Sequence, residues 1–340
     1  MLAGQTPQPP ISRLTGMRLV EIGEGTAAFR IPLTEWLCAP QGAISIGPIT
    51  MPADAAVACA IQTVLGPATP FTTSELSLRL LSPVHPGGSL TARGRLIQSR
   101  RTIALAEVTV LDAHERIVAH GSSMCFVASP VSPVASPVSP AADPLTPAAQ
   151  QPDHGPEEDS GAAAPDEPTP DPYLRPVQGH VLPETTWQST SGLDVMLEQL
   201  AGRLPQPPIH HLTGLRPTDA ADGEVRFVMP ASEWLCAPAR GRVQGGAVAL
   251  LAESALSAAI QTRMPAGTAI APVDLKVNYL RPLATDGRLA HARGHVVHAG
   301  RRIAVAGAEV FDADGKAIAV ATGSAMVLRG RAASLRVAGD

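Results

Sequence analysis

The stretch from Val243 to Leu256, "VQGGAVALLAESAL", combines two features that are able to do chemistry. Gly245 and Gly246 stand where an apolar helix is expected to begin, and without side chains they leave the backbone N–H groups unshielded. Amides at the positive end of a helix dipole stabilise negative charge that develops on a carbonyl oxygen. Eight residues after Gly245 comes a single carboxylate, Glu253. In apolar surroundings such a carboxylate is a usable general base, because desolvation raises its pKa.

Much of the sequence occurs in two similar copies. "PQPPISRLTG" at 7–16 returns as "PQPPIHHLTG" at 205–214, and "EWLCAP" at 35–40 returns unchanged at 233–238. "RRTIALAEVTVLDA" at 100–113 matches "RRIAVAGAEVFDA" at 301–313. The offset between matching segments drifts only from 198 to 202 residues, and similarity of this kind predicts two copies of one fold. In this alignment Asp54 stands opposite Glu253, and "SIG" at 45–47 stands opposite "QGG" at 244–246.

Each copy has the same expected order of elements. A hairpin forms around 23–25 or 222–223, and an Ala-rich helix follows, over 247–262 in the second copy. Three or four strands rich in Val, Ile and Leu come next, with turn signals such as "DADGK". An extra helix opens the second copy, with Ser191 as its N-cap. One long helix covered by an antiparallel sheet is an α+β architecture.

Composition sets the domain boundaries. Residues 129–172 contain twelve prolines and eight acidic residues without any Lys or Arg, so they cannot bury enough apolar surface to fold. We therefore expect copies at 1–127 and 191–330, a Pro-rich acidic linker without regular structure at 128–190, and a tail at 331–340.

The overall composition argues against several classes of protein. The chain of 340 residues is 45% hydrophobic and has a formal net charge of −4, with no basic tract that would suit nucleic acid. The four cysteines show no metal-binding spacing, and His210–His211 is expected at the surface, so neither a metal nor another cofactor is predicted. The absence of a signal-like start and of a long apolar run predicts a cytoplasmic protein that does not enter membranes.

The second copy resembles a known family. "VQGGAVALLAESAL", followed by "VDLKVNYLRP" and "HAGRRIAVAGAEVFDADGKAIAVATGSA", is similar to the phenylacetyl-CoA (PaaI-like) branch of the hotdog-fold acyl-CoA thioesterases. In that family a helix begins with His/Gln-Gly-Gly and carries Asp or Glu eight residues after the first glycine. Gln244, Gly245, Gly246 and Glu253 fit this pattern. The resemblance implies a tandem hotdog protein that hydrolyses an acyl-CoA thioester and needs no cofactor.

The resemblance also implies how the two copies cooperate. Two hotdogs join their sheets edge to edge, here within one chain, and further homo-oligomerisation stays open. The active sites then lie at the interface, where a glycine amide of one copy polarises the carbonyl and a carboxylate of the other copy directs the attacking water.

The two copies differ in which parts of the site they keep. The first copy has an acid and, at the family's Ser/Thr position, a hydroxyl, Asp54 and Thr73. The second copy has the amide cradle of Gln244, Gly245 and Gly246, but Pro272 in place of the hydroxyl. We expect these halves to assemble one competent site. The other site, Glu253 opposite Ile46 and Pro48, is expected to be impaired.

A simpler alternative exists for Asp54. If Pro52 were the first residue of its helix, Asp54 would lie in the first turn and would only complement the helix dipole.

For the phosphates of CoA, the candidates are Arg281, Arg301 and Arg302, because guanidinium groups suit phosphates, together with Asn278 beside Arg281.

Two other functions compete with hydrolysis. One is a catalytically silent hotdog module that binds acyl-CoA or serves assembly, a reading that Pro238 favours because many relatives have Asn or Gln there. The other is a hotdog hydratase or dehydratase, which needs a histidine near the central helix, and neither central helix contains one. The identity of the acyl group does not follow from the sequence.

Overall fold

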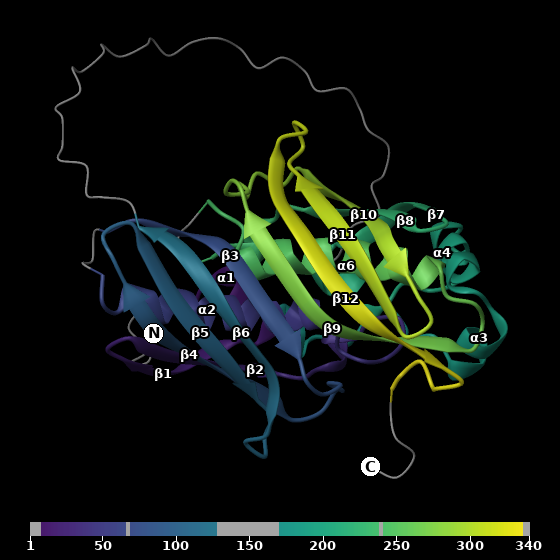
Figure 1. The fold of residues 1–340 in the computed structure, drawn as a ribbon, viewed down its shortest axis with the longest axis horizontal. Coiled ribbons are helices and arrows are strands. Elements are labelled where there is room, and N and C mark those ends of the chain that lie inside the picture. Colours follow the sequence, from purple (N-terminus) through teal and green to yellow (C-terminus); the bar gives the residue numbers. More distant parts are fainter. Residues whose placement is uncertain (1–7, 66–68, 128–169, 238–240, 336–340) are drawn as a thin grey trace.

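One antiparallel sheet runs through both copies of the repeat. The computed structural model describes residues 8–65, 69–127, 170–237 and 241–335. Its twelve strands have the order β1-β2-β4-β5-β6-β3-β9-β12-β11-β10-β8-β7. Each half of this order is one copy, and the sheet curves over the helices of both (Figure 1).

The elements of the two copies correspond one to one. The first copy comprises α1 (Pro10–Thr15), β1 (Arg18–Gly23), β2 (Thr26–Pro32), the 3-10 helix η1 (Glu35–Leu37), α2 (Ile46–Gln62), β3 (Phe71–Leu80), β4 (Ser89–Ser99), β5 (Ile103–Leu111) and β6 (Ile117–Val127). The second copy comprises α5 (Pro208–Thr213), β7 (Arg216–Ala221), β8 (Glu224–Pro230), η3 (Glu233–Leu235), α6 (Gly245–Thr262), β9 (Thr268–Tyr279), β10 (Leu289–Ala299), β11 (Ile303–Phe311) and β12 (Ala317–Arg329). The duplication, the α+β class and the tandem hotdog architecture are thus confirmed.

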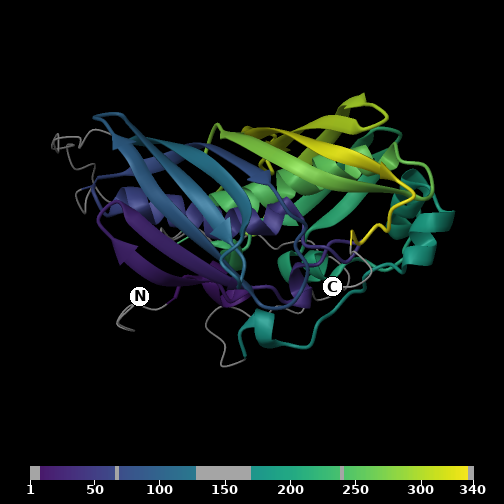
Figure 2. The same ribbon diagram turned by 60° about the horizontal axis from the view of Figure 1, so that its bottom comes forward.

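The long helices α2 and α6 lie beneath the sheet, side by side at their N-terminal turns (Figure 2). Most of their residues are buried, because the sheet covers one side of each helix and the other copy covers another. Close approach to the sheet depends on glycine. A Cβ on Gly94 of β4 would lie 2.5 Å from the backbone carbonyl of Ala56, and Gly294 of β10 is tighter still against the carbonyl of Ala255.

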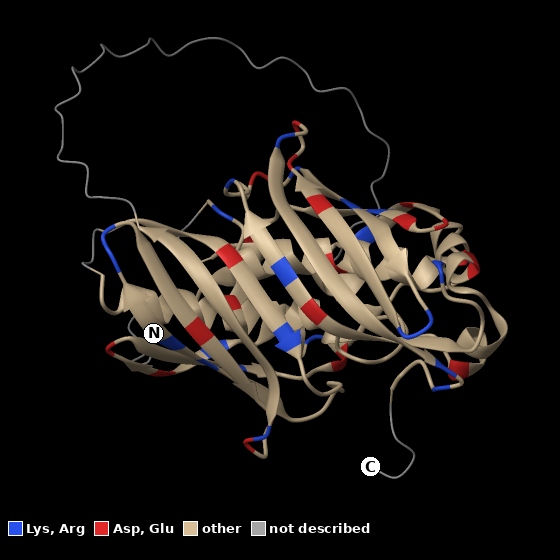
Figure 3. Ribbon diagram, in the orientation of Figure 1, with Lys and Arg blue, Asp and Glu red and all other residues tan. Residues whose placement is uncertain are grey.

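Strands β3 and β9 form the seam between the copies. They pair antiparallel from Glu75 opposite Asn278 to Arg79 opposite Asp274. Acidic and basic side chains are interspersed over these central strands, and neither sign dominates the face that Figure 3 shows. The buried side chains of both copies form one continuous hydrophobic core. The copies are therefore joined by backbone hydrogen bonds and by shared packing, not by the chain connection alone.

The segment between the copies is partly built into the structure. The predicted linker at 128–190 is too long at its C-terminal end, because η2 (Pro172–Leu174) and α3 (Glu184–Ser189) are formed there. Asp171 accepts a hydrogen bond from the Arg13 side chain at 2.8 Å, which attaches this segment to the first copy. Residues 128–169 lie outside the described part. The helix predicted after Ser191 is α4 (Gly192–Leu200), and Ser191 caps it by accepting from the amide of Asp194.

The predicted tail is also partly ordered. Ala333 is buried, and its amide donates to both carboxylate oxygens of Glu184 at 2.9 and 3.1 Å. Trp187 and Leu182 pack with Ala333 in a small second core. Residues 336–340 lie outside the described part.

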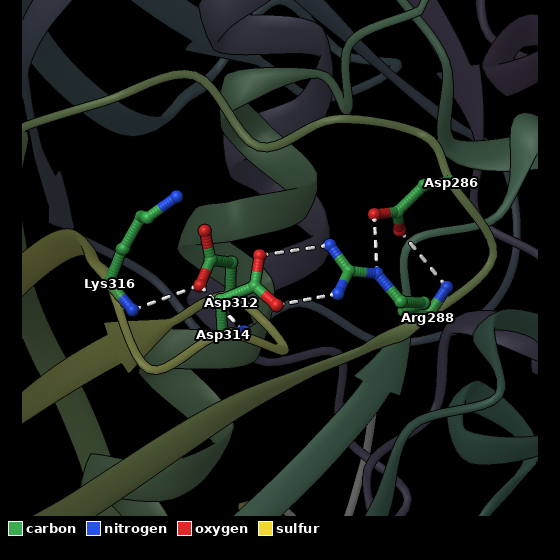
Figure 4. Close-up of polar contacts among 5 residues, drawn as sticks. All are labelled: Asp286, Arg288, Asp312, Asp314 and Lys316. Carbon is green, nitrogen blue, oxygen red and sulfur yellow. Dashed lines mark hydrogen bonds and ion pairs between the residues drawn. The ribbon is translucent and has the colours of Figure 1, made fainter.

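The hairpin turns follow their sequence signals. Asp312 accepts hydrogen bonds from the amides of Asp314 and Lys316, both at 2.9 Å, which closes the β11–β12 turn. Arg288 joins this turn to the β9–β10 connection, since its guanidinium contacts Asp286 and Asp314 (Figure 4). In the first copy Asp112 accepts from the amides of His114 and Arg116 in the same way.

Candidate functional site

The fold brings Asp54 of α2 to the first turn of α6. The amide of Gly246 donates to Asp54 Oδ2 at 3.3 Å, and Thr73 Oγ1 on β3 donates to Asp54 Oδ1 at 3.3 Å. The first copy therefore supplies acid and hydroxyl, and the second copy supplies the amides. Helix α2 begins at Ile46 with Pro52 in its interior, which places Asp54 more than two turns from the helix start. The simpler alternative, Asp54 in the first turn, is wrong.

Burial makes the carboxyl group of Asp54 a weaker acid than usual. Only 5% of the residue is exposed, and desolvation raises its pKa to about 6 even though the bonds from Gly246, Thr73 and Gly245 act in the opposite direction. A carboxylate with a pKa near the working pH can both accept and return a proton.

Two further side chains hold this amide cradle in place. Gln244, the N-cap residue of α6, donates from Nε2 to the carbonyl of Met51 at 2.7 Å, and its Oε1 is buried without a partner. Tyr279 on β9 donates from its hydroxyl to the carbonyl of Gly245 at 2.9 Å. Sequence reasoning missed Tyr279. The repeat alignment contains the signal, because the counterpart of Tyr279 in the first copy is Leu80.

Glu253 occupies the equivalent position at the opposite end of the β3–β9 seam. Ser45 Oγ donates to Glu253 Oε2 at 3.0 Å, and Ser257 Oγ donates to Oε1 at 2.7 Å. Burial raises the pKa of Glu253, while Ser257, Ser45 and the amide of Gly47 lower it. The Gly47 amide thus still faces the carboxylate, although Ile46 and Pro48 flank it in place of a second glycine. The sequence analysis did not anticipate the hydrogen bonds from the two serine hydroxyls.

A cavity of about 110 Å³ opens beside Glu253. Its walls are mostly apolar and come from both copies, from α3 and α4, and from the segment that follows β12. They include Ile44, Leu80, Val84, Trp187, Met196, Ile209, His210, Phe227, Leu250, Ala258, Ile270, Pro272 and Leu335.

His210 is part of this wall, so its predicted surface position is wrong. The ring is buried, stacks edge-on against Phe227 with centroids 5.6 Å apart, and its Nδ1 lies 2.8 Å from Gln206 Oε1. Burial lowers the pKa of His210 to about 3, so the imidazole is neutral at ordinary pH. The neighbouring His211 is exposed.

The arginines predicted for CoA do not form one cluster. Asn278 and Arg281 lie at the Tyr279 end of β9, the end nearer to Asp54, and Arg281 donates to the carbonyl of Ala317 at 2.8 Å. Arg301 and Arg302 lie in the β10–β11 turn, beside the end of β12 that pairs with Thr268. All three arginines are exposed. Arg281 lies at the Tyr279 end of β9, and Arg301 and Arg302 lie near its opposite, Thr268 end.

Two further observations concern the described residues only. None of the helices there combines the length and the apolarity that a membrane span requires. No three His, Cys, Asp or Glu side chains gather there in a way that would hold a metal ion. The four cysteines are not joined in disulfides, and Pro238 lies outside the described part.

Comparison with known proteins agrees with this architecture. The tesB protein of Mycobacterium avium subspecies paratuberculosis has a similar structure, with a TM-score of 0.56 and 14% identity over 94% of this chain and 98% of that one. The acyl-CoA thioesterase II TesB2 of Mycobacterium marinum gives a TM-score of 0.51 at 10% identity, over 94% of this chain and 98% of that one. At such identities the likeness establishes the fold.

Sequence comparison establishes the family. A protein of Halobacterium salinarum that is named as an esterase is 36% identical over 126 residues, which are 34% of this chain and 82% of that protein. The thioesterase superfamily matches twice, at residues 49–119 and 240–319, once in each copy. The chain therefore belongs to the thioesterase superfamily, as a tandem of two thioesterase domains.

Proposed function

We propose that the protein hydrolyses an acyl-CoA thioester, in the manner of the PaaI-like branch, at a site shared by Asp54 of the first copy and the start of α6 in the second. The observation that carries the proposal is the contact between the Asp54 carboxylate and the Gly246 amide. A general base and an oxyanion donor, contributed by different copies, lie within one hydrogen bond of each other. Hydrolysis of a thioester needs these two groups on either side of the reacting carbonyl carbon.

The geometry suggests an order of events. Without substrate the Gly246 amide donates to Asp54, so a thioester carbonyl that enters would take over that donor. The carboxylate then has a free lone pair for a water molecule. Asp54 removes a proton as the water oxygen bonds to the carbonyl carbon, and the C=O electron pair moves to oxygen beside the amides. When the C=O bond re-forms, the C–S bond breaks and the thiolate takes the proton back from Asp54.

The other residues have supporting roles in this proposal. Thr73 orients the carboxylate, and Tyr279 and Gln244 fix the first turn of α6 by their bonds to Gly245 and Met51. Arg281 and Asn278 are the better placed candidates for the CoA phosphates, since they flank Tyr279 in sequence. Arg301 and Arg302 lie at the far end of β12.

The decisive experiment measures thiol release from a panel of acyl-CoAs of different chain length. Asp54→Asn cannot accept the proton and should lower kcat/KM by about 100-fold or more, the usual contribution of a general base. Glu253→Gln is the matched control and should keep the wild-type rate. The reverse result, with Glu253 essential and Asp54 dispensable, would contradict the assignment. If the protein binds acyl-CoA but releases no thiol, the result would favour the catalytically silent binding module over the hydrolase.

A further inference from the structure

The cavity beside Glu253 shows which positions surround an acid of this kind. Its walls are mostly apolar, and Ser45, Leu80 and Ile270 contribute to them. Because both ends of the β3–β9 seam are built from the same repeat, the residues equivalent to these three lie around Asp54. Their sizes determine how much room an acyl group has at the proposed site.

The register of the strands identifies the equivalent residues. Leu80 of β3 stands opposite Ala119 of β6. Tyr279 of β9 stands opposite Ala319 of β12 in the same way, so it is the counterpart of Leu80 at the Asp54 end of the seam.

A second pair follows from the other ends of the same strands. Phe71 of β3 stands opposite Val127 of β6. Ile270 of β9 stands opposite Val327 of β12, so Phe71 is the counterpart of Ile270. Because β3 and β9 are antiparallel, Phe71 and Tyr279 lie at the same end of the seam, and both pack against the hydrophobic core.

In all three pairs the larger side chain lies at the Asp54 end. Tyrosine stands there in place of leucine, and phenylalanine in place of isoleucine. At the helix N-caps, Gln244 of α6 stands in place of Ser45 of α2. In a closely packed interior these exchanges leave an acyl group less room beside Asp54 than the cavity provides beside Glu253.

Tyr279 is also close to the reacting groups. Its hydroxyl donates to the carbonyl of Gly245 at 2.9 Å, and the next amide, that of Gly246, donates to Asp54. Burial raises the pKa of the Tyr279 hydroxyl, and the charge of Asp54 adds to this effect, as expected for neighbours. An acyl chain has to extend from the carbonyl into the apolar interior, because the charged CoA part stays in solvent. The ring of Tyr279 lies there.

We propose that Tyr279, together with Phe71, limits the acyl group at the Asp54 site to about two to four carbon atoms. The inference rests on the proposed hydrolysis and names its substrate class, a short-chain acyl-CoA. Benzene fills an engineered apolar cavity of about 150 Å³, so the cavity of about 110 Å³ beside Glu253 suits roughly five non-hydrogen atoms. The smaller space beside Asp54 admits fewer.

The test measures kcat/KM for thiol release from acetyl-, butyryl-, hexanoyl- and octanoyl-CoA by the full chain. Wild type should favour acetyl-CoA over octanoyl-CoA by about tenfold or more, the range by which an apolar pocket discriminates on size. Tyr279→Leu gives the Asp54 end the side chain of the Glu253 end, so it should lower this ratio by about tenfold. Phe71→Ile should change the ratio in the same direction.

Two matched controls separate size from other effects. Tyr279→Phe keeps the ring and removes the hydrogen bond to Gly245, so it should slow thiol release from every acyl-CoA and leave the ratio as in wild type. Leu80→Tyr makes the reverse exchange at the Glu253 end and should change neither the rate nor the ratio. If Tyr279→Leu does not fold, Phe71→Ile carries the comparison.

Each outcome decides the proposal. A wild type that hydrolyses octanoyl-CoA as well as acetyl-CoA, or a Tyr279→Leu variant with the ratio of Tyr279→Phe, would overturn the size limit and leave the hydrolysis intact. If no acyl-CoA releases thiol, the proposed hydrolysis fails, and the same ratio is measured as Kd by isothermal titration calorimetry. Tyr279→Leu must then gain affinity for octanoyl-CoA relative to acetyl-CoA, and an unchanged ratio of Kd values would refute the size limit as well.

Discussion

At the scale of single residues, the ionisation of Asp54 controls the proposed reaction. Its pKa is raised to about 6 by desolvation, and only the deprotonated form can accept the proton of water. We expect kcat/KM to rise about tenfold per pH unit below about 6 and to level off above it. Thr73→Val removes a bond that lowers this pKa, so the midpoint of the profile should move to higher pH. An unchanged midpoint of the pH profile would show that Thr73 does not influence the ionisation of Asp54.

Another residue stores local strain in a turn. Glu115 has φ of 62° at the β5–β6 turn, where the equivalent residue of the second copy is Gly315 with φ of 76°. For a residue with a side chain, this left-handed conformation costs about 1–2 kcal/mol of folding free energy. Replacement by glycine removes that cost, but part of the gain is lost because glycine gives the unfolded chain more conformational entropy. Glu115→Gly should therefore stabilise the protein by about 0.5–1 kcal/mol, measured as a higher midpoint in urea.

Gly315→Ala is the matched control for that turn. A Cβ at Gly315 would meet no atom within 4 Å, so only the backbone conformation opposes the change. This variant should lose stability. The contact between Arg93 and Glu115, at 3.6 Å between exposed side chains, is too weak to reverse the prediction. Equal stability of Glu115→Gly and wild type would mean that the turn relaxes at no cost.

At the scale of elements, the crossing of α2 and α6 fixes the site. A Cβ on Gly246 would lie 2.5 Å from the Cα of Met51, and Thr50 Oγ1 donates to the Gly246 carbonyl at 2.8 Å. Gly246→Ala should destabilise the fold by about 1–3 kcal/mol, as overpacking does, and should lower thioester turnover as well. Thermal unfolding and thiol release measure the two effects.

The obstructing atoms at this crossing belong to the backbone. Shortening the Met51 side chain therefore gives no relief, and Met51→Ala combined with Gly246→Ala should be less stable than Gly246→Ala alone. A double variant that recovers wild-type stability would show that the helices can move apart.

The sequence predicted those elements whose signals are local. The hairpin turn at Asp312 and the cap at Ser191 form as expected, because each depends on hydrogen bonds to nearby backbone. The start of α2 was harder to predict. Proline usually ends or begins a helix, yet Pro52 lies inside α2, where packing against the sheet and α6 overrides the local preference. Tyr279 was missed because its partner, the Gly245 carbonyl, belongs to another element. His210 was placed wrongly because the side chains that bury it, such as Phe227, come from other segments.

At the scale of the whole molecule, the two copies are held together by more than the connecting chain. Five residue pairs join β3 to β9, and the hydrophobic core is continuous across them. Residues 1–127 and 170–340, produced together as separate chains, should therefore form a one-to-one complex in size-exclusion chromatography. This complex should release thiol at the rate of the intact protein. Separate elution of the two fragments would contradict the prediction.

The β3–β9 seam has one more consequence. In a homodimer of identical chains each substitution appears twice, because symmetry forces both sites to change together. Here both partners are encoded in one polypeptide, so position 80 could become leucine while position 279 became tyrosine. Because the two sequences are independent, a substitution at one end of the seam leaves the other end unchanged.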